Sequence, residues 1–349
     1  MDAARIPSDV VLEILEFTTD TDLPTLCLLN SAFYSHARDY LYRHISGLNA
    51  AEACLSIIRN PSLAPLVRSF ELPVHARTLP KDYTFTSVLQ RALPMMTNLT
   101  CLKLMLYASY SSVLENCHQA LDLRILHCAL FPDPKLAAFI RSQANLTELM
   151  TDHASDVWAD FGGSIDTITR LNKLIAPWSV AKTLTPGRPI RDLTITTSFR
   201  DCQLSFMEAS IATIEHLSVQ SLLLGSLRGG IPSEGLRHLT VDCCGVDARV
   251  HFSAPTPWLS ENIRTLSHLQ SCTLVGLKCS GYREDQVDLK TDMLNFLSLL
   301  RINPASELRN FSFGVIHTTM ISALGQTNVK MQDMQLRWKR NGDSWLEEE

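Results

Sequence analysis

The residues that could perform chemistry in this 349-residue chain are few and scattered. Asp152 and His153 are adjacent, and Asp156 and Asp160 follow closely. A carboxylate beside an imidazole could act as a general acid–base pair. Carboxylates at this spacing are nevertheless more typical of a solvated helix start. We therefore rank a hydrolase that would use Asp152, His153 or Cys244 last among the possible functions.

The cysteines and glycines also lack the spacing of a familiar active site. None of the ten cysteines forms a C-x-x-C pair, and the neighbours Cys243 and Cys244 are unsuited to bridging each other. In a reducing compartment such cysteines are expected to be small buried hydrophobes. Gly225, Gly229 and Gly230 lack the spacing and the Lys-Ser/Thr of a phosphate-binding loop. The sequence predicts a non-catalytic protein with no metal and no cofactor.

The composition narrows the class of partner. The chain is 46% hydrophobic and 19% charged with a net charge of −5, and its densest basic run spans only residues 337–340. This mixed, mildly acidic charge distribution produces no positive electrostatic potential that would attract nucleic acid. The apolar block at 293–300 is far short of the roughly 20 residues that span a bilayer. Because the N-terminus has no targeting character, we expect an intracellular protein, cytoplasmic and/or nuclear, without a membrane partner.

Three short helices are expected in the first 45 residues. Residues 8–17 place apolar side chains at helical spacing, with Pro7 ahead of them in the first-turn region. A second helix is expected at 23–30 and a third at 31–45. Their shared core would be marginal for a lone domain, so the unit is better suited to packing on a neighbour or a partner chain.

Residues 6–33 resemble an F-box. Ile6, Pro7 and Asp9 match the opening of the family pattern, and an acidic turn leads into an Asp22-Leu23 pair. An apolar ladder follows the opening, and the match ends at the aromatic Phe33. Two positions depart from the family: Asp9 stands where Glu is usual, and Thr18 stands where an apolar residue is usual, which could weaken adaptor binding.

The resemblance implies that residues 1–45 dock on a Skp-family adaptor and, through it, on a cullin. The residues implied in the docking surface and the small core beneath it are Ile6, Pro7, Val10, Val11, Ile14, Leu15, Leu23, Leu26 and Leu29.

A repeat follows this segment. The pattern Φ-x-x-Φ-x-Φ, where Φ is apolar, begins at positions 67, 99, 123, 146, 171, 190, 214, 236, 269, 308 and 331. Most successive copies lie 19 to 25 residues apart, close to the period of about 20 to 29 in leucine-rich repeats. Helices are expected between copies, at 132–143, 259–269 and 290–303.

The expected fold class is α/β: an N-terminal three-helix F-box followed by a right-handed leucine-rich-repeat-like solenoid with parallel strands. It resembles the irregular repeats that often follow F-boxes, although Asn or Cys closes the turn only at Cys244. A compact α/β domain with coincidental spacing stays open. The expected divisions are residues 1–45, a helical linker at 46–66, a substrate-binding repeat domain at 67–340 and an acidic tail at 341–349.

The function that the F-box resemblance implies is substrate recognition in a Skp–cullin–F-box ubiquitin ligase. Polar residues between the inward apolar ones would line the concave strand face, which suits a protein substrate. The candidate substrate-binding residues are Lys103, His127, Asp152, Gln220, Asp242 and Arg337. The alternative is a non-catalytic repeat scaffold whose F-box-like segment is only an N-terminal cap.

Overall fold

The computed structural model describes residues 7–19, 22–29, 31–47, 50–72, 83–105, 111–117, 120–153, 158, 168–196, 204–220, 235–243, 266–279, 297, 308–323, 326–341 and 344–348. The chain forms two compact units. The N-terminal unit comprises residues 1–153 and 166–170, and the C-terminal unit comprises residues 154–165 and 171–349.

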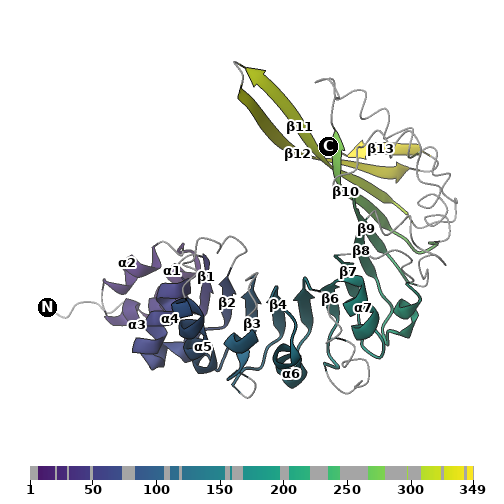
Figure 1. The fold of residues 1–349 in the computed structure, drawn as a ribbon. Helices are drawn as coiled ribbons and strands as arrows, with labels where there is room; N and C mark the ends of the chain where they lie inside the picture. The colour runs from purple at the N-terminus through teal and green to yellow at the C-terminus, as the bar shows by residue number, and fades with distance from the viewer. Residues whose placement is uncertain are drawn as a thin grey trace. The chain divides into compact units, whose positions relative to one another are not determined.

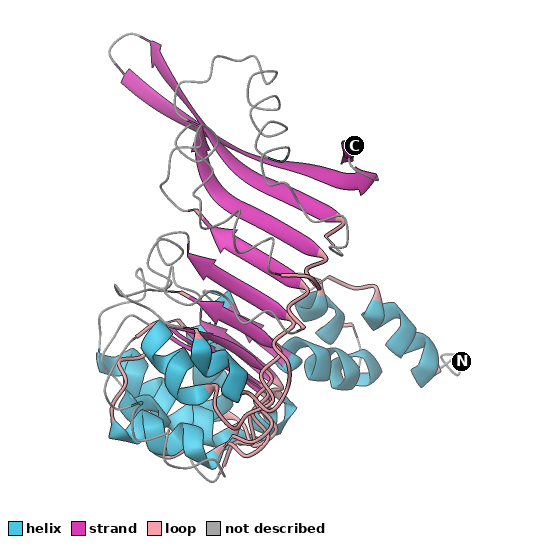
Figure 2. Cartoon of the chain, turned by 90° about the vertical axis from the view of Figure 1, so that its right-hand side faces the viewer, coloured by secondary structure: helices cyan, strands magenta, loops and turns pink. Residues whose placement is uncertain are grey.

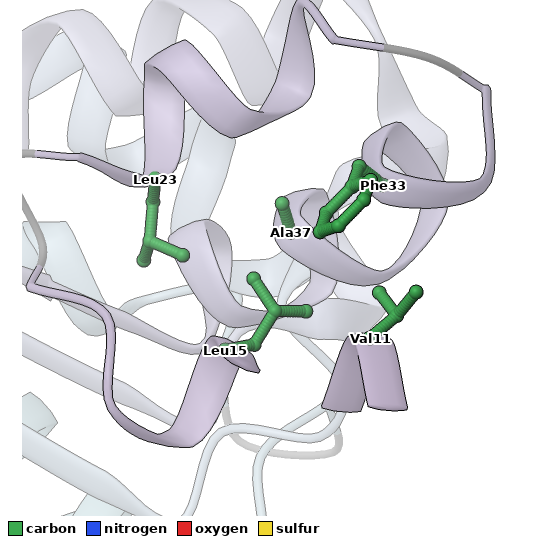
Figure 3. Packing of buried hydrophobic residues seen from close by; sticks show 5 residues of the cluster. All are labelled: Val11, Leu15, Leu23, Phe33 and Ala37. Carbon is green, nitrogen blue, oxygen red and sulfur yellow. The ribbon is translucent and has the colours of Figure 1, made fainter. Parts of the chain in front are cut away.

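Three helices close on their own core at the start of the N-terminal unit: α1 (Ser8–Glu16), α2 (Leu23–Cys27) and α3 (Ser31–Arg43). The carbonyl of Pro7 accepts hydrogen bonds from the amides of Val10 and Val11, at 3.1 and 3.2 Å, so the proline lies at the cap of α1. Five buried side chains converge between the helices, as Figure 3 shows: Val11, Leu15, Leu23, Phe33 and Ala37.

Parallel strands follow these helices. They are β1 (His44–Ser46), β2 (Ser69–Leu72), β3 (Cys101–Leu104), β4 (Ile125–Cys128) and β5 (Glu148–Thr151). Neighbouring strands pair in chain order, which Figure 1 shows for β1 to β4. The helical segments between them are α4 (Ala50–Arg59), η2 (Pro61–Leu66), α5 (Tyr83–Ala92), η4 (Leu93–Met95), η5 (Ser111–Leu114) and α6 (Pro134–Ser142). The linker expected at 46–66 is therefore largely helical, whereas β1 was not predicted.

The C-terminal unit continues the pattern by itself. Its parallel strands are β6 (Lys173–Ala176), β7 (Asp192–Ile195), β8 (His216–Gln220), β9 (His238–Asp242), β10 (Ser271–Cys279) and β11 (Asn310–Ala323). Helix α7 (Trp178–Leu184) lies between β6 and β7, and η7 (Ser205–Ala209) lies between β7 and β8. From β6 to β11 each strand pairs in parallel with the next. Two antiparallel strands complete the unit, β12 (Gln326–Asn341) and β13 (Ser344–Glu348). β11 and β12 are the longest arrows in Figure 2.

The repeat signature predicts the strands well. In each of the first ten copies, one of the parallel strands from β2 to β11 begins at the third position. The apolar positions point inward: Leu99, Leu102 and Leu104 are all at most 1% exposed. Alternation along a strand puts the residues between them on the opposite face. The structure is thus mixed α/β with mostly parallel strands in both units, consistent with a repeat solenoid.

One expectation at the C-terminal end needs correction. The copy at 331 lies in β12, which is antiparallel to β11. The reason is the connection: Ala323 and Gln326 are separated by two residues, and a parallel pair needs a far longer crossover. Most of the segment expected as an acidic tail forms β13. The helix expected at 132–143 is present as α6, while those at 259–269 and 290–303 lie almost wholly outside the described residues.

Arg188 is a buried cation in the C-terminal unit, 1% exposed. Its Nη1 donates to the carbonyl of Leu184 at 3.0 Å and to that of Pro186 at 3.3 Å, so it satisfies the end of α7. Burial lowers the pKa of Arg188.

Arg188→Met is expected to destabilise the chain because it leaves these carbonyls without their buried donor. The expected loss is about 2–4 kcal/mol in the free energy of unfolding, measured by denaturant titration. Lys182→Met, at an exposed position of α7 over the Trp178 ring, is the control and should cost less than about 1 kcal/mol. Equal midpoints for the two variants would contradict a capping role for Arg188.

Candidate protein-binding surfaces

Helix α1 has an apolar face that the chain does not cover. Val10 and Ile14 are 42% and 40% exposed and lie at i and i+4 on one side of α1, and Phe17, the C-cap residue at i+7, is 84% exposed. Val11 and Leu15, on the other side, are each 1% exposed. The helix is therefore apolar on two sides, and only one of them is used by the core.

Two further apolar side chains project beyond the end of α2. Leu28 is 86% exposed and Leu29 is 60% exposed. We call Val10, Ile14, Phe17, Leu28 and Leu29 together the helical apolar surface. Large side chains are commonly exposed one at a time, and five within 20 residues make this part of the chain a candidate protein-binding surface.

The structure divides the nine residues that the F-box resemblance selected. Val11, Leu15 and Leu23 are buried core residues, which a partner could not contact directly. Leu26 is partly buried against the same core. Pro7, Val10, Ile14 and Leu29 are exposed, and Ile6 lies outside the described residues.

Sequence reasoning missed Phe17 and Leu28 as surface residues. The sequence pattern placed Phe17 among the apolar residues of the first helix but did not say whether its side chain faces the core or the solvent. Its place three residues after Ile14 was the available signal, because that spacing continues the exposed face.

Thr18, the departure from the family pattern, has a local role. Its hydroxyl donates to the carbonyl of Ile14 at 2.7 Å, and the hydroxyl of Thr19 donates to Asp22 Oδ2 at 2.6 Å. These bonds satisfy the end of α1 and the turn that follows it. The effect of Thr18 on adaptor binding stays a prediction.

The strand face of the N-terminal unit carries polar side chains that contact one another across strands. Lys103 and His127 are register partners on β3 and β4. Lys103 Nζ lies 3.2 Å from Glu71 Oε2, and His127 Nε2 lies 2.8 Å from Glu148 Oε1. Both predicted substrate-binding residues are therefore partly exposed on one face, but each is already engaged by a neighbour.

Asp152 and His153 follow β5 and do not form the pair that acid–base chemistry would need. His153 Nε2 lies 3.1 Å from the carbonyl oxygen of Ala129, which can only accept, so this nitrogen donates. The His153 ring also lies 6.0 Å from that of Phe131. Asp152 is partly exposed. His153 thus has a structural contact, and Asp152 remains a surface candidate.

In the C-terminal unit a polar chain crosses four strands. His216 Nε2 lies 3.8 Å from Asp192 Oδ1, and the rings of His216 and His238 stack with centroids 4.3 Å apart. His238 Nδ1 lies 2.7 Å from Ser271 Oγ. Burial lowers the pKa of His238, and the nearby His216 and Arg237 lower it further. The two histidines occupy the same position of successive repeat copies, which was a usable but unused sequence signal.

The other predicted substrate-binding residues also fall in the C-terminal unit. Gln220 and Asp242 are register partners on β8 and β9, and both are partly exposed. Arg337 is exposed on β12, opposite Ser312 of β11. Gln220 and Asp242 therefore lie together, whereas Arg337 lies three strands beyond β9.

Burial suppresses the reactivity of most described cysteines. It raises the pKa of Cys54, Cys117 and Cys128 to about 12 in each case, and it also raises the pKa of Cys272. Such thiols are not nucleophiles at neutral pH. Cys244 lies outside the described residues.

Within the described ranges, no cluster of three or more His, Cys, Asp or Glu side chains could hold a metal ion. Among these same residues no helix has the length and apolarity needed to cross a membrane.

Comparison with solved structures finds a distant likeness in fold. No protein-family model matches the sequence, and no curated protein matches it. The chain is similar to one in the crystal structure of the Rad7 and Elc1 complex in yeast, with 11% identity and a TM-score of 0.37. The match covers 80% of this chain and 93% of the other.

Proposed function

We propose that this chain is a substrate-recognition subunit of a Skp–cullin–F-box ubiquitin ligase. Residues 1–45 dock on a Skp-family adaptor and, through it, on a cullin, while the strand faces bind a protein substrate. Such a subunit acts in the cytoplasm and/or the nucleus.

The helical apolar surface carries this proposal. The core of α1–α3 is already closed, since Val11, Leu15 and Leu23 are at most 3% exposed. Phe17 and Leu28 are not part of this core, because each is more than four-fifths exposed. Covering one such side chain yields about 1.5–3 kcal/mol, which is available only from a partner.

The alternative of a plain N-terminal cap has one observation in its favour. β1 begins at His44, directly after α3, and α3 contacts both β1 and η2. The helices are thus continuous with the end of the strand array. A cap, however, needs a polar outer face to keep a repeat array soluble. The exposed Phe17, Leu28 and Leu29 are the opposite of such a face.

The proposed mechanism is proximity and requires no catalytic group in this chain. Holding a substrate on the strand faces, while α1 and α2 hold the adaptor, raises the local concentration of substrate lysines near the ubiquitin-transfer centre.

Affinity capture with mass spectrometry tests the proposal in cells. The full chain is compared with a Leu28→Asp/Leu29→Asp variant and with the control Leu55→Asp, which changes a 40% exposed leucine on α4. Adaptor and cullin should be captured by the wild type and the control and be lost from the double variant. Capture of neither by the wild type, or retention of both by the double variant, would refute the proposal.

A further inference from the structure

Two histidine rings stack against each other on the strand face of the C-terminal unit. His216 of β8 and His238 of β9 are register partners, their ring centroids lie 4.3 Å apart, and the ring planes are 13° from parallel. Neighbouring strands are spaced by about 4.8 Å, so the pairing of the two backbones itself holds the rings in contact. We call these two residues the histidine pair.

Each end of the histidine pair has one polar partner. His216 Nε2 lies 3.8 Å from Asp192 Oδ1 of β7, and His238 Nδ1 lies 2.7 Å from Ser271 Oγ of β10. A hydroxyl can donate to a neutral ring nitrogen or accept from a protonated one, so the Ser271 contact is compatible with both charge states. A proton on His216 would make its contact with Asp192 an ion pair. The histidine pair can therefore accept one proton without losing a contact.

The ionisable groups around the histidine pair come from several strands. Asp192 of β7 has Lys173 of β6 as its register partner. Glu215, directly before β8, has its Oε1 3.5 Å from Arg191 Nη1, and Arg237 directly precedes β9. At the register position of the histidine pair, β10 contributes only the neutral Ser271. Both carboxylates thus have a cationic residue as neighbour, and a further cation lies beside His238.

These surroundings oppose a second proton on the histidine pair. Burial lowers the pKa of His238 from its ordinary value of 6.5, His216 and Arg237 lower it further, and Glu215 and Asp192 offset them only in part. A group whose pKa is lowered on folding stabilises the folded form fully above its unfolded pKa. That stability is lost as the pH falls through the lowered pKa. The window in which the stack is destabilised therefore lies below about pH 6.5.

We propose that the histidine pair is a pH-sensitive switch in the strand face of the C-terminal unit. The rings stay stacked while the histidine pair carries at most one proton. A second proton places two like charges at a centroid separation of 4.3 Å. The rings then separate by rotation of His216, whose side chain is 51% exposed, and the first residues of β8 and β9 lose their order.

The switch acts on residues that a bound partner could contact. Ser218 and Thr240 are register partners two positions further along β8 and β9, and both are partly exposed. The intervening Leu217 and Leu239 are each 1% exposed, so alternation puts Ser218 and Thr240 on the same face as the histidine pair. Acidification is thus expected to loosen this strand face, a property that goes beyond the proposed function and does not depend on the adaptor.

The N-terminal strand face supplies a matched control. His127 Nε2 lies 2.8 Å from Glu148 Oε1, and the register partners of His127 on β3 and β5 are Lys103 and Met150. This histidine therefore has a carboxylate partner, as His216 has, but no second imidazole at its register positions. His127→Gln removes a titrating ring from a strand face without removing a stacked pair.

Hydrogen exchange of the full chain, followed by mass spectrometry at about pH 7.5 and about pH 5.5, tests the inference. Protection factors, corrected for the intrinsic effect of pH on exchange, are compared for residues 216–220 and 238–242. In the wild type they should fall at least about threefold at the lower pH. His216→Gln should abolish this fall because it removes one of the two charges, and His127→Gln should behave as the wild type does. An equal fall in the wild type and in His216→Gln, or its loss in His127→Gln, would overturn the inference.

Proton NMR of the histidine side chains gives a second measurement that does not depend on local unfolding. The signal of His238 is identified by its absence from the spectrum of His238→Gln. In His216→Gln the pKa of His238 should rise, because the charge of His216 no longer lowers it. An unchanged titration of His238 in that variant would overturn the inference.

The switch and the ligase assignment fail separately in these experiments. His216→Gln changes a side chain of β8 and should bind the adaptor as the wild type does. A pH-dependent fall in protection without any adaptor complex would remove the ligase assignment alone. An adaptor complex with pH-independent protection factors would remove the switch alone.

Discussion

Phe17→Asp is expected to weaken the complex between this chain and a Skp-family adaptor at least about 100-fold, or about 2.7 kcal/mol. Phe17 is 84% exposed and directly follows α1, seven residues after Val10 and three after Ile14. In the complex an aspartate there would lose the contact of the ring and would also bury a charge. Because the residue does not contribute to the core of α1–α3, far-UV circular dichroism and the thermal midpoint should not change. Titration calorimetry against the purified adaptor measures the loss.

Ile211→Asp is the control for this prediction. Ile211 is 72% exposed in the C-terminal unit, so the substitution introduces the same charge at a comparably exposed apolar site. Its affinity for the adaptor should equal that of the wild type. If Phe17→Asp binds as tightly as Ile211→Asp, α1 is not the docking helix.

Leu15→Asp is expected to unfold the three N-terminal helices. Leu15 is 1% exposed and packs with Val11, Leu23, Phe33 and Ala37 in a small core (Figure 3). Removing a buried leucine costs about 2–5 kcal/mol, and an unpaired carboxylate in its place costs more. A core of this size cannot absorb that loss. Hydrogen exchange followed by mass spectrometry should show protection of residues 8–43 reduced to the unfolded level.

Leu12→Asp on the same helix provides the comparison. Leu12 is 37% exposed, and an aspartate there remains in contact with water. Exchange in residues 8–43 should stay within the range of the wild type. Undiminished protection in Leu15→Asp would show that α1 does not depend on the core in which the structure places it.

The strands were predictable because each one is marked by a short apolar pattern within six consecutive residues. Each Φ-x-x-Φ-x-Φ copy specifies which side chains turn inward, and Leu99, Leu102 and Leu104 are buried as that pattern requires. Strand direction is not encoded in the six residues. The copy at 331 has the same pattern as the others, yet β12 runs antiparallel because only two residues separate it from β11.

The candidate surfaces were predictable only in part. The positions of Lys103 and His127 on the strand face follow from alternation, but their pairing with Glu71 and Glu148 depends on register between copies. That register is set by the connecting segments and by packing, which a single sequence does not reveal. In α1 the apolar spacing fits two sides at once, so the sequence could not say that Leu15 is core and Phe17 surface.

The central claim is that the first three helices form a docking surface for a Skp-family adaptor. Size-exclusion chromatography with light scattering on a mixture of the purified full chain and the purified adaptor tests it most directly. The account predicts a one-to-one complex that persists at concentrations on the order of 1 µM. A folded chain that elutes separately from the adaptor at about 100 µM would contradict it.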